Sequence, residues 1–434
     1  MIARLDLRGD TPSRAELLAA VPRATTEGPS AADAAADLIA DVRTRGSGAL
    51  LDQAERFDGG CPPSLRVDPG EIARAVGDLP RAVRDALEES IDRVRTASRV
   101  QIPPPAVTEP AAGARIVQRW MPVGRVGLYV PGGKAAYPSS VVMNVVPAQV
   151  AGVAELAMAS PPQAAHGFRV HPLILGAAGL LGIDEVYAMG GAGAVAAFAY
   201  GVPDAGIAPV DLVTGPGNRF VAAAKRLVRG VVGVDSEAGT TEVLVIADET
   251  ADPRWVAADL ISQAEHDEYA AAVLVTTSAR LADDVAAELS VQAATTASGD
   301  RVAAALSGSQ SAIVLVDDLE TAARFSDAYA PEHLEIQTRA PGELLDLIHD
   351  AGAIFLGAHT PVSLGDYLAG SNHVLPTAGG ARFSAGLSAA TFLRAQQVVE
   401  YDAGALGRVA PHIRALSDAE GLPAHGDAVD IRLA

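Results

Sequence analysis

Residues 125–160 read RVGLYVPGGKAAYPSSVVMNVVPAQVAGVAELAMAS and contain one unit of a pattern that recurs along the chain. An apolar strand is expected at Val126–Val130, a helix at Ser139–Val150 and a second strand at Glu155–Ala159. Strands that alternate with helices in this way are typical of a parallel sheet with helices on both faces. The stretch therefore predicts an α/β protein built on parallel strands.

The alternation continues as two consecutive series. Further strands are expected at Glu185–Met189, Asp211–Thr214, Val231–Val234, Glu242–Ile246, Ala272–Thr276, Ala312–Val316, Leu334–Gln337 and Ala353–Leu356. Further helices are expected at Pro172–Leu181, Ala192–Tyr200, Arg219–Val228, Pro253–Glu265, Leu281–Leu289, Leu319–Tyr329 and Gly342–His349. The two series predict two tandem Rossmann-like doubly wound parallel-sheet domains. Helical spacing of apolar residues before residue 99 and after residue 386 adds a helical N-terminal segment and a helical C-terminal tail.

Composition limits the classes of function. The chain has 434 residues, enough for two or more domains, and its formal net charge of −20 disfavours binding to nucleic-acid phosphates. The sequence has no run of about 18 uncharged apolar residues, and Met1–Asp6 lacks the apolar core of a signal peptide. We therefore expect a cytoplasmic protein with no membrane or nucleic-acid partner. The single cysteine, Cys61, can form neither an internal disulfide nor a thiolate metal cage.

The densest polar cluster, Ser262–Glu268, closes a helix whose start is marked by Asp252 and Pro253. Gln263 and His266 lie on one face of this helix end, so both can reach the same target. An imidazole at this spacing from an oxygen donor is a plausible half of a zinc site. The alternative is a solvated acidic helix end.

A carboxylate and an imidazole, Glu332 and His333, precede the strand expected at Leu334–Gln337. Pro331 introduces an irregular turn from which both side chains can converge. Such a pair suits general acid–base catalysis. The alternative is a structural histidine at the edge of the strand.

The loop after the strand Ala353–Leu356 carries Asp366 and His373 among glycines. Ligands of open α/β sheets gather at the carboxyl ends of strands, so Asp366 is a candidate to complete a metal site there. His373 is a candidate neighbour or structural residue, and His425 is a candidate fourth ligand. We therefore expect a metal-dependent enzyme with six candidate residues: Gln263, His266, Glu332, His333, Asp366 and His425.

Glycine-rich turns follow three strands of the first series, at Tyr129–Gly133, Gly190–Gly193 and Gly215–Asn218. Each turn precedes a helix, whose first N–H groups can bind the phosphates of a dinucleotide. Neither of the last two has the full Gly-x-Gly-x-x-Gly pattern followed by a ribose-binding acid. The geometry of tight turns explains them equally well.

Together these segments closely resemble the histidinol dehydrogenase family, from about Arg4 to His425. The most specific stretches are VGLYVPGG at 126–133, TGPGN at 214–218, SQAEHD at 262–267, PEHL at 331–334, and GDY through GSNHVLP at 365–376. The resemblance implies oxidation of L-histidinol to L-histidine, the last step of histidine biosynthesis. In this family two hydrides pass in succession to NAD, through L-histidinaldehyde, with one Zn²⁺ per subunit.

The resemblance also implies roles for individual residues. The zinc ligands would be Gln263, His266, Asp366 and His425, the last from the partner subunit, so a homodimer with a shared active site is implied. His333 would be the general base, and Glu332 would activate the water that hydrates the aldehyde. Substrate contacts would come from Thr241, Gln263, His266, His333, Asp366, Glu420 and His425, with Glu420 also from the partner. NAD contacts would come from Tyr129, Gly193 and Asn218.

We expect four parts in the chain. They are an N-terminal arm (1–24), a larger α/β domain with the metal and catalytic residues (25–128 and 242–385), an NAD-binding Rossmann-like domain (129–241), and a C-terminal helical tail that reaches the partner subunit (386–434). Cys61 lies outside every cluster, so hydration of the aldehyde is expected rather than attack by a thiolate.

Two positions depart from the family's usual sequence. Gly193 stands where the family usually has glutamine, so an amide expected to contact the cofactor is missing. Thr240 replaces the usual proline, whereas Thr241 keeps a hydroxyl. Two other functions remain open: oxidation of another polar alcohol by the same fold, and a zinc hydrolase in which Glu332 activates water. Retention of Glu420 and His425 favours histidinol.

Overall fold

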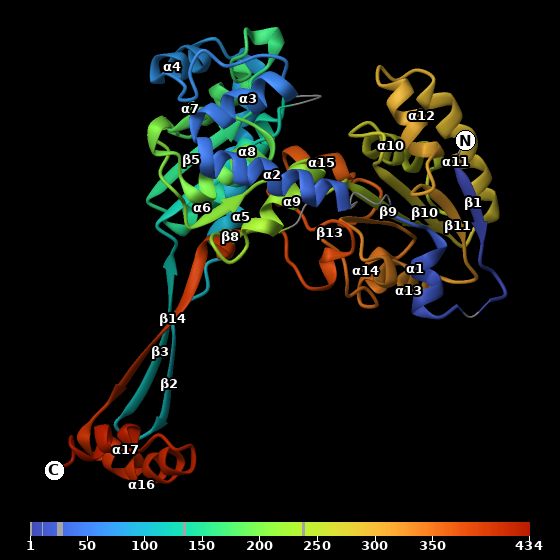
Figure 1. Cartoon of the computed structure of the whole chain (residues 1–434). Helices are drawn as coiled ribbons and strands as arrows, with labels where there is room; N and C mark the ends of the chain where they lie inside the picture. The colour runs from blue at the N-terminus through green and yellow to red at the C-terminus, as the bar shows by residue number, and fades with distance from the viewer. Residues whose placement is uncertain (1, 11, 24–28, 133–135, 237–238) are drawn as a thin grey trace.

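A computed structural model of the chain describes residues 2–10, 12–23, 29–132, 136–236 and 239–434. Gly133, at the end of one predicted glycine turn, lies outside the described residues, as does residue 24 at the end of the expected arm. Figure 1 shows two lobes, each with a sheet and its helices, and an extended arm that leads away to the C-terminal helices. None of the helices in the described ranges is long and apolar enough to cross a membrane.

The first lobe is a five-stranded parallel sheet with the order β6-β5-β4-β7-β8. Its strands are β4 (Arg125–Tyr129), β5 (Glu155–Ser160), β6 (Val186–Ala188), β7 (Leu212–Thr214) and β8 (Gly233–Val234). Its helices are α6 (Pro138–Ala151), α7 (Pro172–Leu180), α8 (Gly191–Tyr200) and α9 (Arg219–Val228). The chain winds in opposite directions on the two sides of β4. The carboxyl ends of β4 and β7 therefore form the position at which this type of sheet binds ligands.

Four earlier helices also pack on the first lobe: α2 (Pro29–Arg45), α3 (Ser47–Phe57), α4 (Pro69–Gly77) and α5 (Arg81–Arg99). Contacts join α2 and α3 to α8, α4 to α7, and α5 to α6. This packing corrects the expected grouping of residues 25–128 with 242–385. The apolar faces of these helices, with Leu50 in α3 and Ile91 in α5, complete the two cores beside the first sheet.

The second lobe is a six-stranded parallel sheet with the order β1-β11-β10-β9-β12-β13. Its strands are β1 (Ala3–Asp6), β9 (Glu242–Ala247), β10 (Ala271–Thr276), β11 (Ala312–Leu315), β12 (His333–Gln337) and β13 (Ala353–Leu356). Its helices are α1 (Arg14–Ala20), α10 (Pro253–Ala264), α11 (Ala279–Ala293), α12 (Gly299–Ser307), α13 (Leu319–Tyr329), α14 (Pro341–Leu345) and α15 (Val362–Tyr367). The prediction of two parallel-sheet units is confirmed. The expected N-terminal arm is instead part of this lobe, because β1 pairs with β11 and α1 packs on α13.

The arm is a three-stranded antiparallel ribbon with the order β14-β3-β2. It consists of β2 (Ala106–Ala111), β3 (Ala114–Pro122) and β14 (Leu393–Tyr401), and ends in α16 (Ala403–Ala419) and α17 (Pro423–Asp430). The expected helical tail from residue 386 thus contains α16 and α17, and the strand β14, which the sequence did not predict, precedes them. Every residue of β14 after Leu393 is exposed, so the strand has no buried face to produce a readable apolar alternation.

Candidate functional site

The candidate catalytic residues lie at the amino edge of the second sheet. Glu332 directly precedes β12 and His333 begins it, and the neighbouring strand β9 begins at Glu242, directly after Thr241. The helix α10 runs back along the sheet, so its last turn brings Gln263 to the same edge. The expectation that the site gathers at the carboxyl ends of strands is therefore wrong for this lobe.

Two groups donate hydrogen bonds to Glu332, and a third group supports one of them. The Thr241 hydroxyl donates to Glu332 Oε2 at 2.6 Å, and the Glu242 amide donates to the same oxygen at 2.9 Å. Gln263 Nε2 in turn donates to Thr241 Oγ1 at 2.7 Å. Burial raises the pKa of Glu332 to about 8, although these hydrogen bonds act in the opposite direction. This carboxyl therefore exchanges its proton near neutral pH.

His333 is a buried imidazole with one ring nitrogen engaged and the other without a partner. Its Nδ1 donates to the carbonyl oxygen of Glu242 at 3.0 Å, so Nε2 carries the lone pair of the neutral ring. Nε2 is buried and makes no hydrogen bond in the described part of the chain. Burial lowers the pKa of His333, whereas the charge of Asp366 opposes this shift. A neutral imidazole with an unpartnered nitrogen is suited to accept a proton.

His266 and Asp366 lie close enough to His333 to affect one another electrostatically. Burial lowers the pKa of His266, the Asp366 charge raises it, and His333 lowers it. Asp366 belongs to α15, which Figure 1 shows between the lobes. The chain thus returns from the carboxyl end of β13 toward the amino edge of the sheet. This return brings Asp366 to His266 and His333, three residues that are far apart in sequence.

His373 connects this region to the first lobe. Its Nδ1 donates to the carbonyl oxygen of Asp366 at 3.0 Å, and its Nε2 lies 3.3 Å from the Ser140 hydroxyl of α6. Asn372 Nδ2 also donates to the carbonyl oxygen of Met143 in α6 at 2.7 Å. The loop with Asp366 is therefore fixed by contacts to both lobes.

One chain does not assemble the whole predicted metal site. Among the described residues, no group of three or more histidine, cysteine, aspartate or glutamate side chains is arranged to hold a metal ion. Glu420 follows α16 and His425 lies in α17, both at the far end of the arm in Figure 1. Gln263, His266 and Asp366 therefore lack the expected fourth ligand within their own chain.

Comparison with known proteins gives one consistent result. The family model described as histidinol dehydrogenase matches residues 21–433. A histidinol dehydrogenase of Leifsonia xyli subsp. xyli is 65% identical over 428 residues, covering 99% of this chain and 98% of that protein. One from Nocardia farcinica is 57% identical over 434 residues, covering 99% and 98%. The crystal structure of histidinol dehydrogenase from Elizabethkingia anophelis is 31% identical, covers 100% of this chain and 98% of that chain, and superposes with a TM-score of 0.92.

The chain belongs to the histidinol dehydrogenase family. The predicted family is confirmed, and with it an NAD-dependent oxidoreductase that catalyses the last step of histidine biosynthesis. The substrate histidinol follows from this membership. Histidinol dehydrogenases as a family use NAD and zinc. Family membership also removes the zinc hydrolase and the oxidation of another alcohol from the open alternatives.

The three residues predicted to contact NAD lie at the carboxyl edge of the first sheet. Tyr129 ends β4, and its buried hydroxyl accepts a hydrogen bond from the Gly191 amide at 3.2 Å. Asn218 caps α9, since its Oδ1 accepts from Phe220 N at 3.0 Å and from Val221 N at 3.2 Å. A side chain at Gly193 would run into Gln53 of α3. Gly193 has no side chain, so any contact that it makes with a cofactor would involve its backbone.

Sequence reasoning missed two groups of charged residues beside the candidate site. Arg23 lies 3.1 Å from the Glu242 carboxylate and donates to the backbone oxygens of Tyr329 and Ala330, just before Glu332 and His333. Glu242 also accepts from the Ala378 amide at 2.6 Å, and burial raises its pKa to about 7. Arg23 is isolated in the sequence, so nothing there points to this role.

The second missed group is a buried acid pair that joins α10 to β12. Gln337 Nε2 donates to Asp259 Oδ2 at 3.0 Å and to Glu335 Oε1 at 2.9 Å. Burial raises the pKa of Asp259 to about 6 and the pKa of Glu335 well above its usual range. Glu335 is two residues from His333 on one strand, so the alternation of a β-strand places both on the same face. The pair Asp259 and Glu335 therefore lies next to the candidate site, on the same face of β12 as His333.

This acid pair predicts a specific dependence of stability on pH. Both carboxyls hold protons in the folded chain at pH values where the unfolded chain, with pKa values of about 4, has lost them. Their contribution to the free energy of unfolding is complete below about pH 4 and is lost as pH rises through the folded pKa values. Glu335→Gln should therefore make the decline in stability from pH 5 to pH 8 shallower, as measured by urea unfolding of metal-free protein.

The matched control is Glu343→Gln, which changes an exposed glutamate of α14 and should keep the wild-type slope. An unchanged slope in Glu335→Gln would show that the acid pair does not retain its proton in the folded protein.

Proposed function

We propose that the chain oxidises L-histidinol to L-histidine through L-histidinaldehyde, with two molecules of NAD and one zinc ion per subunit. The observation that carries this proposal is the pair Glu332 and His333. A buried neutral imidazole with an unpartnered Nε2 lies beside a carboxyl whose pKa is about 8. Both lie next to nitrogen and oxygen donors of the kinds that bind zinc.

The donor set at the site suits zinc. Burial favours the neutral form of His266, which is the form that binds a metal ion. The amide nitrogen of Gln263 is engaged by Thr241, so its carbonyl oxygen is the end that would serve as a ligand. Asp366 adds a carboxylate within electrostatic range of His266. When bound, the zinc would supply a fixed attachment point for the imidazole and amine of the substrate.

The first oxidation needs a base for the alcohol proton. His333 Nε2 accepts that proton while hydride passes from the carbinol carbon to NAD, which gives the aldehyde and NADH. The hydrogen bond from Nδ1 to the Glu242 carbonyl keeps the ring in the correct tautomer and stabilises the imidazolium that forms.

The second oxidation needs a hydrated aldehyde. Glu332 removes a proton from the attacking water, and the imidazolium of His333 returns its proton to the aldehyde oxygen, so the hydrate forms and His333 is neutral again. The hydrate then loses hydride to a second NAD and a hydroxyl proton to His333, which gives the carboxylic acid. A thiolate route is disfavoured because Cys61 is exposed in the first lobe, where desolvation and the nearby Glu55 raise the pKa of its thiol.

NAD is assigned to the carboxyl edge of the first sheet, at the change of winding direction between β4 and β7. Tyr129, Asn218 and the backbone of Gly193 are the proposed contacts. The Asn218 side chain caps α9, and the first N–H groups of that helix suit the negative charge of a pyrophosphate. A cytoplasmic location is consistent with this biosynthetic role and stays a prediction.

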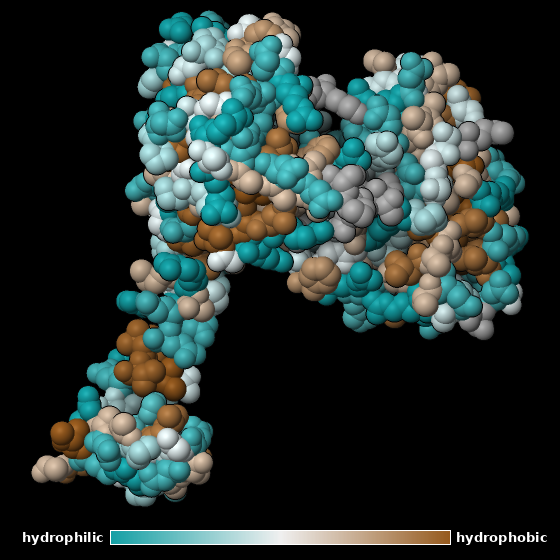
Figure 2. Space-filling view, in the orientation of Figure 1, coloured by the Kyte–Doolittle hydropathy of each residue, from teal (hydrophilic) through white to brown (hydrophobic). Residues whose placement is uncertain are grey.

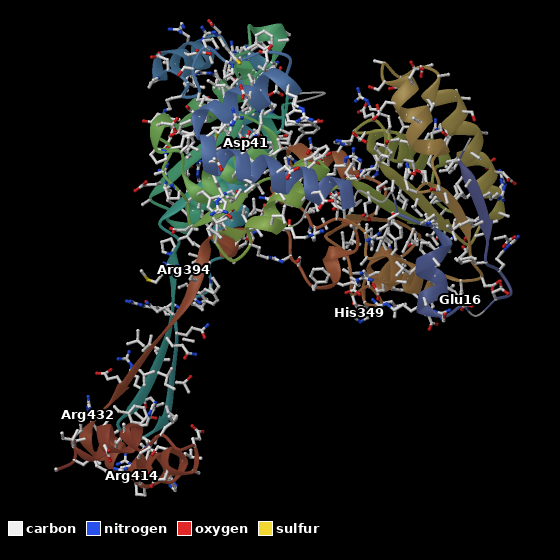
Figure 3. The ribbon with its side chains drawn as sticks, viewed as in Figure 1. Glu16, Asp41, His349, Arg394, Arg414 and Arg432 are labelled. Atoms are coloured by element: carbon white, nitrogen blue, oxygen red, sulfur yellow. The ribbon has the colours of Figure 1, made fainter. Side chains whose placement is uncertain are left out.

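A homodimer is proposed because the arm carries two expected site residues away from their own lobes. Arg414 ties α16 to α17 through Asp427 at 2.8 Å and thereby fixes the segment with Glu420 and His425. Figure 3 labels Arg414 and Arg432 at this tip. Figure 2 shows apolar surface along the arm, where Val107 and Val399 are more than half exposed. Contact with a second subunit would cover this surface and bring the partner's His425 to the zinc site.

The proposed reaction predicts a fixed stoichiometry. Zinc-loaded protein given limiting L-histidinol and excess NAD should form two NADH per histidinol, measured by absorbance after complete turnover. Glu332→Gln should form the first NADH and then stop or slow at the aldehyde, because the water lacks a base. Exhaustion of the substrate at one NADH by the unaltered protein would contradict the four-electron reaction. Absence of NADH from zinc-loaded protein would contradict the dehydrogenase assignment.

The shared site predicts complementation between two inactive variants. His333→Asn removes the base and should lower kcat by about 10²–10⁴-fold, and His425→Asn should weaken zinc binding. In a mixed dimer one of the two sites contains both intact residues. Random exchange of subunits should therefore restore roughly a quarter of the wild-type activity. The control mixes His333→Asn with Glu332→Gln, and no site in that mixture has both Glu332 and His333 intact. Activity is measured in both mixtures as L-histidine formed, because Glu332→Gln alone still completes the first oxidation. Equal activity in the two mixtures would contradict a shared site.

A further inference from the structure

Lys225 is a fully buried lysine in a chain that has only two lysines. It lies in α9 and forms an ion pair with Asp235, which follows β8; their side chains are 1% and 2% exposed. Removing two charges from water costs several kcal/mol per ion in general, and apolar residues of similar volume often stabilise a fold equally well. Stability alone therefore gives a weak account of this pair.

Both members of the pair hold the same glycine. Lys225 Nζ donates to the carbonyl oxygen of Gly215 at 3.0 Å, and the Gly215 amide donates to Asp235 Oδ2 at 2.8 Å. The two backbone polar groups of one residue are thus fixed by opposite charges. Charge-assisted hydrogen bonds of this kind are stronger than neutral ones. The conformation of Gly215 is therefore set by the ion pair.

The backbone of Gly215 also packs closely against the end of β4. Its φ angle is +113°, and a Cβ atom at this position would overlap the carbonyl oxygen of Tyr129. Only glycine combines this φ with so close an approach. Gly215 is thus confined between the ion pair on one side and the Tyr129 backbone on the other.

This confined glycine begins the turn that leads to Asn218 and α9. The turn lies at the change of winding direction between β4 and β7, where the sheet type binds its ligand. The side chain of Tyr129 extends the same assembly, because its hydroxyl accepts from the Gly191 amide at the start of α8. The turns after β4, β6 and β7 are therefore linked to one another through Tyr129 and Gly215.

We propose that Lys225 and Asp235 are positioning residues for the dinucleotide. They hold the Gly215–Asn218 turn in the conformation that receives the pyrophosphate of NAD, without touching the cofactor themselves. Preorganised backbone N–H groups bind an anion without the cost of ordering a loop. This inference rests on the proposed location of NAD in the first lobe.

The test uses full-length protein and direct binding of NADH, measured by fluorescence titration. The variant Lys225→Met/Asp235→Leu removes both charges together, so neither remains buried and unpaired. It should fold, bind zinc and L-histidinol like wild type, and bind NADH with a Kd raised on the order of tenfold. Lys225→Met/Asp235→Asn also leaves no buried charge but keeps an acceptor for the Gly215 amide, and should raise the Kd less.

The matched control is Arg125→Met/Glu185→Leu. It removes a second ion pair of the same sheet, at the opposite end of β4 from Tyr129, and should leave the Kd for NADH unchanged. An unchanged Kd in the Lys225/Asp235 double variant would overturn the positioning role. Equal weakening of NADH, zinc and histidinol binding would also overturn it in favour of a general structural role. Failure of the unaltered protein to bind NADH would instead overturn the proposed location of the cofactor.

Discussion

The backbone of Glu242 holds both proposed catalytic side chains, those of Glu332 and His333, and the rest of the candidate site depends on this arrangement. Its amide donates to the Glu332 carboxylate, and its carbonyl oxygen accepts from His333 Nδ1. Parallel pairing of β9 with β12 makes both bonds possible, because it sets Glu242–Val243 beside Glu332–His333. Sheet register thus fixes the tautomer of His333. Burial at the same edge removes competing water and keeps the imidazole neutral.

The two lobes are joined by a chain of hydrogen bonds between their functional edges. Thr214, at the end of β7, donates to Asn144 Oδ1 at 2.9 Å, and Asn144 Nδ2 donates to the Ser140 carbonyl at 2.8 Å. The Ser140 hydroxyl meets His373, which in turn donates to the carbonyl oxygen of Asp366. The carboxyl edge of one sheet is thereby held in a fixed relation to the amino edge of the other. If histidinol and NAD bind at these two edges, as proposed, hydride transfer between them requires such a relation.

Much of the fold could be predicted because its parallel strands are buried on both faces. Runs such as Val243–Ala247 are continuously apolar. The segments between them carry apolar residues at helical spacing, so they are readily identified as helices. The strands of the arm were not predicted, because a strand such as β14 has no buried face and therefore no alternation of apolar and polar residues. The helices α2 to α5 were assigned to the wrong lobe because an apolar stripe identifies a helix as packed but does not identify its partner.

Only part of the candidate site could be predicted from the sequence. Gln263 and His266 share a helix end, so local spacing suffices to associate them. Asp366 was expected at a carboxyl end, and only the return of the chain through α15 places it at the amino edge. Arg23 donates to the backbone oxygen of Ala330, which is distant in sequence. Lys225 donates to the backbone oxygen of Gly215. No motif in the sequence encodes such contacts.

The central claim is that His333 is a neutral base with its proton on Nδ1 and a free Nε2. The most direct measurement is ¹⁵N NMR of histidine-labelled protein near pH 7, with His333→Asn used to assign the resonances. The account predicts a protonated Nδ1 and an unprotonated Nε2 for His333 near pH 7, and less protonation of this ring than of a free histidine as the pH is lowered toward 6. A ring protonated on both nitrogens at pH 7, or protonated on Nε2 alone, would contradict it.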